Sequence, residues 1–361
     1  MDNLIKYFKE LVYIPGLAGH EQRVCDYMSS KLKDMGLEPF KDVHGNCIAK
    51  INGKLGLGPV MVFAHMDSLG FLVKHIDPDG FIKLERLGGI PEKILPSSRV
   101  TITAGNGRDI SGVIGVKSHH ITPPEEKYKV IPYAELYVDV GAKSRSNVLE
   151  MGIDIGCPVV YKPNFTELAN GRVQATTIDD RGGCAVLLAL AELLVNNPPA
   201  ADIFIVGTVQ EEYNLRGAMM ASRSINPKAA IAIDCAPSGD TPDLKESGGG
   251  LLGEGPVMTL YNFHGRGTLN GTIAHPAMAR LMKAASESSG IRLQKTVYVG
   301  GLTDLAYLQL EGKGVIGIDM GFPMRYSHSS VEVCDTKDMR ELVTLLQSAV
   351  GLIDNNTQWS R

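Results

Sequence analysis

The most constraining feature of this sequence is the run PVMVFAH at residues 59–65, which stays apolar until its final histidine. A strand with one solvent-exposed face alternates apolar and polar residues, whereas a strand covered on both faces gives an uninterrupted apolar run. The run therefore predicts a strand buried on both faces of an α/β sheet, with helices packed above and below it.

The rest of the chain predicts two kinds of architecture. Helical periodicity at 4–12 and 21–35 precedes strands at 47–51 and 59–64, and helices at 182–195, 277–289, 303–311 and 336–354 alternate with strands at 203–209, 229–234 and 315–320. Between 71 and 165, short β-rich runs are separated by Gly, Pro, Asn and Asp turns. We expect a doubly wound mixed sheet flanked by helices, formed by 1–70 and 166–361, with a small inserted β-barrel at 71–165.

Composition excludes several classes of protein. A chain of 361 residues that is 44% hydrophobic has the length and the core of about two globular domains. Its formal charge of −4 gives no reason to expect nucleic acid or an anionic membrane as partner. No run is long enough to span a membrane, and the N-terminus does not resemble a signal peptide. The six cysteines are scattered singly, which favours a reducing, cytoplasmic compartment.

Metal-competent side chains follow the predicted strands. They occur in five segments, in the order His65 and Asp67, Asp179 and Asp180, Glu211 and Glu212, Asp234, and His328. Ligands in open α/β sheets bind at the carboxyl ends of the strands, so we expect these side chains to meet at one edge. Two histidines with several carboxylates suit two divalent ions, zinc above all. Taken singly, the His-x-Asp pair is weak evidence, and the paired aspartates also fit a helix N-cap.

The order His-x-Asp, Asp-Asp-Arg-Gly-Gly, Glu-Glu, Asp, His resembles that of the M42 metalloaminopeptidases, which include the glutamyl and tetrahedral aminopeptidases. The likeness covers nearly the whole chain, including the segments GLAGHEQRV, GVIG and GGLTDLA. It implies removal of the N-terminal residue of short peptides by a pair of metal ions, with zinc the expected metal and cobalt an alternative. It also implies assembly into homo-oligomers, commonly dodecamers, through the β insert.

The resemblance also implies roles for individual residues. Asp179 would bridge both ions, His65 and Asp234 would complete one site, and Glu212 and His328 would complete the other. Glu211 would act as the general base, and Asp67 would orient His65. The remaining histidines, among them His264, match no ligand position and are expected to be structural.

The sequence departs from the family pattern near the expected substrate site. Tyr213 and Asn214 stand where a small Val-Gly-like pair is usual, Met324 and Ser327 replace Thr and Ile, and Leu302 is inserted before Thr303. Specificity therefore cannot be transferred from the family. Arg325 leaves two options open, since it fits either an acidic substrate side chain or a carboxylate of the protein itself.

Other functions remain as alternatives. A related two-metal carboxypeptidase or deacylase would need a dedicated cation for the substrate carboxylate, and the insert contains basic residues in no recognisable pattern. A glycosidase would use two carboxylates without metals, which fits adjacent glutamates and two histidines poorly. A catalytically inactive assembly protein would be expected to have lost a ligand.

Overall fold

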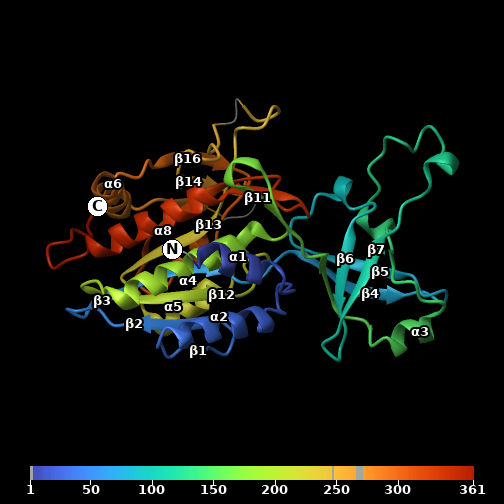
Figure 1. Ribbon diagram of the computed structural model, residues 1–361, viewed down its shortest axis with the longest axis horizontal. Coiled ribbons are helices and arrows are strands. Elements are labelled where there is room, and N and C mark those ends of the chain that lie inside the picture. The colour runs from blue at the N-terminus through green and yellow to red at the C-terminus, as the bar shows by residue number, and fades with distance from the viewer. Residues whose placement is uncertain (1–2, 246–247, 266–270) are drawn as a thin grey trace.

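The computed structural model describes residues 3–245, 248–265 and 271–361 (Figure 1). A larger α/β lobe and a smaller β lobe stand side by side. The helices are α1 (Leu4–Val12), α2 (Gln22–Asp34), α3 (Arg145–Glu150), α4 (Ile178–Asn196), α5 (Gly217–Ile225), α6 (Pro276–Ser289), α7 (Leu305–Leu308) and α8 (Thr336–Gly351). None of the helices in these ranges is both long and apolar enough to cross a bilayer.

A mixed sheet forms the centre of the larger lobe, in the order β1-β2-β12-β3-β13-β17-β18-β11-β10, with β14, β15 and β16 branching from β17. Strands β12, β3, β13 and β17 run parallel, and β2, β14 and β18 pair antiparallel with them. These strands are β1 (Phe40–Lys41), β2 (Cys47–Ile51), β3 (Leu57–His65), β10 (Phe165–Glu167), β11 (Arg172–Ala175), β12 (Ala201–Thr208), β13 (Ala229–Pro237), β14 (Val257–Phe263), β15 (Gly271–Ile273), β16 (Gln294–Val299), β17 (Ile316–Arg325) and β18 (Glu332–Asp335). The prediction of a large mixed sheet flanked by helices is confirmed.

Strand β3 is buried on both faces, as its apolar run predicts. Val60, Val62 and Ala64 pack into the core formed with α1, α2, α4, α6 and α8. Met61 and Phe63 point to the opposite face and pack against α5 and α7. Since successive side chains of a strand alternate between its faces, the absence of a polar residue from 59 to 64 follows directly from this double cover.

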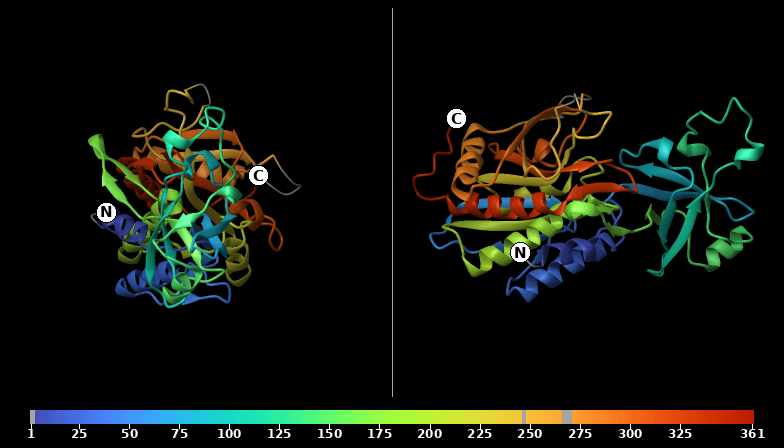
Figure 2. Two further views of the ribbon diagram at one scale, coloured as in Figure 1. Left: turned by 90° about the vertical axis from the view of Figure 1, so that its right-hand side faces the viewer. Right: turned by 45° about the horizontal axis from the view of Figure 1, so that its top comes forward.

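The smaller lobe has its own core. Strands β4 (Gly70–Ile76), β5 (Ile82–Leu87), β6 (Arg99–Thr103), β7 (Asp109–Ile114), β8 (Val138–Asp139) and β9 (Pro158–Tyr161) close into a barrel. Phe71, Ile102 and Val159 belong to a hydrophobic cluster separate from those of the α/β lobe. The barrel projects from the end of the larger lobe (Figure 2), and an ion pair of 2.9 Å between Arg23 and Asp109 connects the two.

Candidate metal and catalytic site

The carboxyl ends of two central strands diverge and leave room for a site. β3 and β13 pair only as far as Phe63 and Ala232, and beyond this point β13 continues alongside β17. Helix α4 contacts both strands, and its first residues depart from helical geometry, with Thr177 at φ 55° and Asp179 at ψ 107°. Open α/β sheets bind ligands where neighbouring strands separate in this way.

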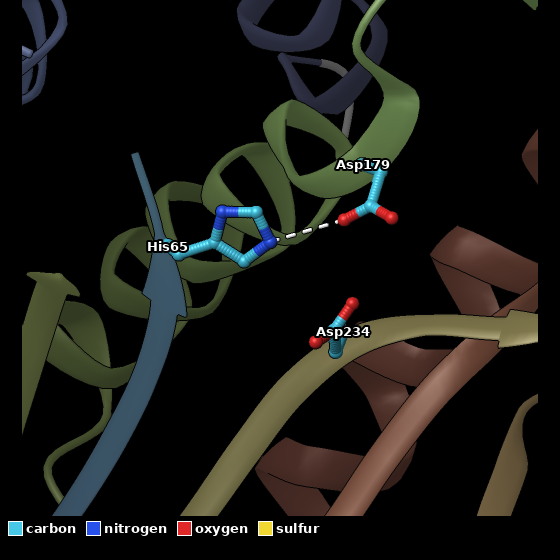
Figure 3. Close-up of side chains that lie close together, drawn as sticks. All are labelled: His65, Asp179 and Asp234. Atoms are coloured by element: carbon cyan, nitrogen blue, oxygen red, sulfur yellow. Dashed lines mark hydrogen bonds and ion pairs between the residues drawn. The ribbon is translucent and has the colours of Figure 1, made fainter. Parts of the chain in front are cut away.

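Three of the expected ligands meet at this divergence. His65 ends β3, Asp179 lies at the start of α4 and Asp234 lies on β13, and their side chains point toward one another (Figure 3). One ligand atom from each lies within 4.8 Å of the others. The Nε2 of His65 is 3.0 Å from Oδ1 of Asp179. An imidazole with two carboxylates is a suitable donor set for a divalent ion such as zinc.

A second group uses Asp179 again, together with Glu212 and His328. The Nε2 of His328 lies 3.6 Å from Oδ2 of Asp179 and 3.7 Å from Oε1 of Glu212. The two oxygens of Asp179 therefore face different histidines, Oδ1 toward His65 and Oδ2 toward His328. A carboxylate in this position could contact two closely spaced ions at once.

Glu211 lies beside both groups and is only 9% exposed. Burial raises the pKa of its carboxyl, His65 lowers it, and the negative charges of Glu212 and Asp234 raise it again, for a value well above the ordinary one. Among the described residues, Glu211 belongs to neither ligand group. A carboxyl that is free of a ligand role and has a raised pKa is suited to carrying a proton.

Asp67 holds the main chain at the two glutamates. Its Oδ1 accepts a hydrogen bond from the Glu211 amide and its Oδ2 one from the Glu212 amide, both at 3.0 Å. The Nδ1 of His65 contacts the main-chain oxygen of Asp67 at 3.1 Å, closer than the carboxylate at 3.6 Å. Asp67 thus contacts His65 as expected, but its carboxylate also positions Glu211 and Glu212, which the His-x-Asp pattern did not indicate.

Glu332 plays a similar part on the other side, and the sequence analysis missed it. Its Oε1 accepts from the His328 amide at 2.8 Å and its Oε2 accepts from the Asp179 amide at 3.3 Å. The side chain is almost fully buried. The only signal in the sequence was an acidic residue next to the short apolar pair Val333-Cys334.

Most of the candidate ligands line a cleft of about 950 Å³. Its walls include Asp179, Glu211, Glu212, Asp234 and His328, the segment at 296–302, and parts of the loop that follows β13. Gly248 and Gly249, in the glycine-rich stretch that follows β13, also line the cleft. His264, expected to be structural, also lines the cleft.

The departures from the family pattern lie in different surroundings. Asn214, Leu302 and Ser327 line the cleft. Tyr213 is half-exposed, with the guanidinium of Arg216 4.7 Å from the centre of its ring, and Met324 is buried.

Arg325 pairs with a carboxylate of the protein. Its Nε and Nη2 each donate to a different oxygen of Asp240 at 2.7 Å. The option that it binds an acidic substrate side chain is therefore not supported by its position.

Comparison with known proteins gives the family of this chain. The model of the M42 glutamyl aminopeptidase family matches residues 45–345. The chain belongs to the M42 family. It is 32% identical to the lysyl aminopeptidase of Pyrococcus furiosus, over 94% of each protein. The structure of aminopeptidase APDkam598 from the archaeon Desulfurococcus kamchatkensis matches with a TM-score of 0.91 and 33% identity, over 98% of this chain and 95% of that one.

A second similar structure is that of the TET1 peptidase of Pyrococcus horikoshii, which can assemble into a tetrahedron or a large octahedral shell. It matches with a TM-score of 0.85 and 28% identity, over 97% of this chain and 100% of that one. The resemblance inferred from the motif order is confirmed, and family membership with named aminopeptidase relatives supports an aminopeptidase activity.

Proposed function

We propose that this M42 protein is a two-metal aminopeptidase that removes the N-terminal residue from short peptides. The observation that carries the proposal is the position of Asp179, whose two oxygens face two separate groups of potential ligands. His65 and Asp234 would hold one ion with Asp179, and Glu212 and His328 would hold the other. The mixed nitrogen and oxygen donors favour zinc, with cobalt as an alternative.

The residues around the two proposed ions have separate roles in hydrolysis. When bound, two divalent ions supply Lewis-acid activation of a water and of the scissile carbonyl. Glu211 accepts a proton from the attacking water and later delivers it to the nitrogen of the leaving amine. Asp67 and Glu332 keep the main chain of the site residues in place. The concentration of negative charge at this end of the cleft favours a substrate with a free amino group.

The test uses aminoacyl-p-nitroanilides and short peptides, each with and without an N-acetyl group, on protein loaded with Zn²⁺ or Co²⁺. Hydrolysis should require a free N-terminus and disappear with a chelator. In the Glu211→Gln variant we expect kcat to fall about 10²–10⁴-fold while two metals remain bound. Equal cleavage of acetylated substrates would refute an aminopeptidase, and cleavage from the C-terminal end would favour the carboxypeptidase alternative.

We further propose that residues 71–165 form a separate domain through which the chain self-associates, with a dodecamer as one possible assembly. The smaller lobe exposes the apolar residues Val116, Ile121, Tyr128 and Val130, and clusters of exposed apolar side chains mark protein interfaces. TET1, a relative of similar fold, forms large shells. All six cysteines are free, which fits the cytoplasmic location that we propose.

Light scattering on a sizing column tests self-association. We expect a multiple of the 38.9 kDa chain, and a smaller species when Ile121→Asp places a charge on this surface. Leu55→Asp, which changes an exposed leucine of the larger lobe (59% exposed, against 73% for Ile121), is the control. A monomeric wild-type protein would refute the assembly.

A further inference from the structure

Tyr298 stands in the wall of the cleft that also contains the candidate ligands. It lies on β16, which pairs only with β14 among the described strands. The cleft is lined by residues 296–302 of this region and by Asp179, Glu211 and Asp234. Gly301 borders the ring, since a Cβ there would lie 3.0 Å from Cε2 of Tyr298. The position of the ring is therefore set by the strand and by a glycine that leaves space for it.

The phenol of Tyr298 lies among negative charges. Burial raises its pKa, and the carboxyls of Asp234, Asp319, Asp179 and Glu211 raise it further. Three of these carboxyls, those of Asp179, Glu211 and Asp234, line the same cleft as Tyr298. A phenol in these surroundings keeps its proton at neutral pH and remains a hydrogen-bond donor.

The hydroxyl of Tyr298 has no acceptor within the part of the chain that the structure describes. Two other tyrosines donate to carboxylates, Tyr27 to Glu10 at 2.6 Å and Tyr133 to Glu85 at 2.7 Å. Tyrosine hydroxyls usually find a partner when they are buried. A donor that faces a cleft without an internal partner is available to a bound molecule.

We propose that Tyr298 is a further catalytic residue, whose hydroxyl donates a hydrogen bond to the carbonyl oxygen of the scissile peptide bond. This proposal rests on the aminopeptidase function proposed above. As the water oxygen bonds to the carbonyl carbon, the π electrons of the C=O bond move onto its oxygen. Collapse of this species restores the C=O bond and breaks the C–N bond, while Glu211 protonates the leaving nitrogen. Tyr298 keeps its proton throughout and stabilises the negative oxygen.

The hydrogen bond from such a donor is stronger in the transition state than in the complex with bound substrate. Its loss therefore lowers kcat more than it changes KM. Removal of one such donor typically costs about 10²–10³-fold in kcat. We therefore expect Tyr298→Phe to lower kcat by about 10²-fold or more, with KM changed less than about threefold. Metal content and thermal unfolding should match the wild type, because only one oxygen atom is removed.

Two further measurements separate this role from a structural one. A phosphinic dipeptide analogue, which imitates the tetrahedral species, should bind Tyr298→Phe about 10²-fold more weakly, whereas a product amino acid should bind equally well. Tyr261→Phe removes a hydroxyl from the neighbouring strand β14, outside the cleft lining, and should leave kcat unchanged.

Wild-type kcat in Tyr298→Phe, or a change confined to KM, would overturn the proposal. A failure of the metal-loaded wild-type protein to cleave any peptide would instead count against the aminopeptidase function itself.

Discussion

Replacement of Glu332 by Gln tests whether a buried carboxylate outside the ligand set holds the site together. In the native protein its two oxygens accept hydrogen bonds from the amides of His328 and Asp179. A carboxamide of nearly the same shape has one oxygen and one NH₂ group. One of the two amides therefore faces a donor in place of an acceptor, and both lose the assistance of the negative charge.

The magnitude follows from these two contacts. A hydrogen bond to a charged group contributes about 1.5–3 kcal/mol, and a buried donor left without a partner costs about 1–3 kcal/mol. We expect Glu332→Gln to destabilise the native arrangement of the site by about 2–4 kcal/mol, and part of this change should appear as weaker metal binding. Loss of a group that supports metal ligands typically lowers affinity about 10–100-fold. Because Asp179 belongs to both ligand groups, both ions should be bound less tightly.

Competition with a chromophoric chelator measures the two affinities directly in the metal-free protein. Activity should recover at high free Zn²⁺, since binding to the native arrangement favours that arrangement by mass action. Glu311→Gln is the matched control, because it removes a carboxylate that pairs with Arg223 at the surface, away from the site. Zn²⁺ affinities in Glu332→Gln equal to those of the wild type would refute the reasoning.

For two other substitutions, the structure gives the direction of the change in stability. Burial opposes ionisation of Asp240, but the hydrogen bonds from Arg325 outweigh it and lower the pKa of Asp240 to about 2. This lies below the unfolded value of about 3.9, so the stability it contributes is present above about pH 4 and lost as the pH falls toward 2. Urea unfolding measures this effect: between about pH 4 and pH 2 the free energy of unfolding of Asp240→Asn should fall by about 2 kcal/mol less than that of the wild type. Equal decreases would contradict the assignment. Gly321→Ala would bring a Cβ to 2.0 Å from the carbonyl oxygen of Asp234, and we expect a loss of about 3 kcal/mol and weaker metal binding. Gly351→Ala, with nothing within 4 Å of the new Cβ, is its control, and similar melting temperatures for the two variants would show that β17 adapts.

Much of the central architecture could be predicted because the sequence records it locally. The apolar run before His65 reports burial on both faces, and the predicted helix at 336–354 and strand at 229–234 correspond closely to α8 and β13. Helix α7 is shorter than the predicted helix at 303–311. In that segment Thr303 and Asp304 are committed to hydrogen bonds with Asp319 and Thr208.

Contacts between distant segments could not be predicted in the same way. The sequence does not show whether an Asp or Glu binds a neighbouring side chain or accepts hydrogen bonds from two main-chain amides. Asp67 was recognised through its spacing from His65, yet its hydrogen bonds to Glu211 and Glu212 depend on the pairing of β3 with β12. Glu332 had no such neighbour in the sequence. Its contact with Asp179 exists only after β17, β18 and the start of α4 have come together.

Asp67 and Glu332 contact the site in the same way. Asp67 spans the amides of Glu211 and Glu212, and Glu332 spans those of Asp179 and His328, so each fixes the main chain of two site residues with a single side chain. Both are buried beside a cluster that is already acidic. Buried negative charges repel one another unless a cation compensates them. A purely structural role could be filled by neutral acceptors, whereas carboxylates at both positions fit the two-metal site proposed above, whose positive charge would offset their repulsion.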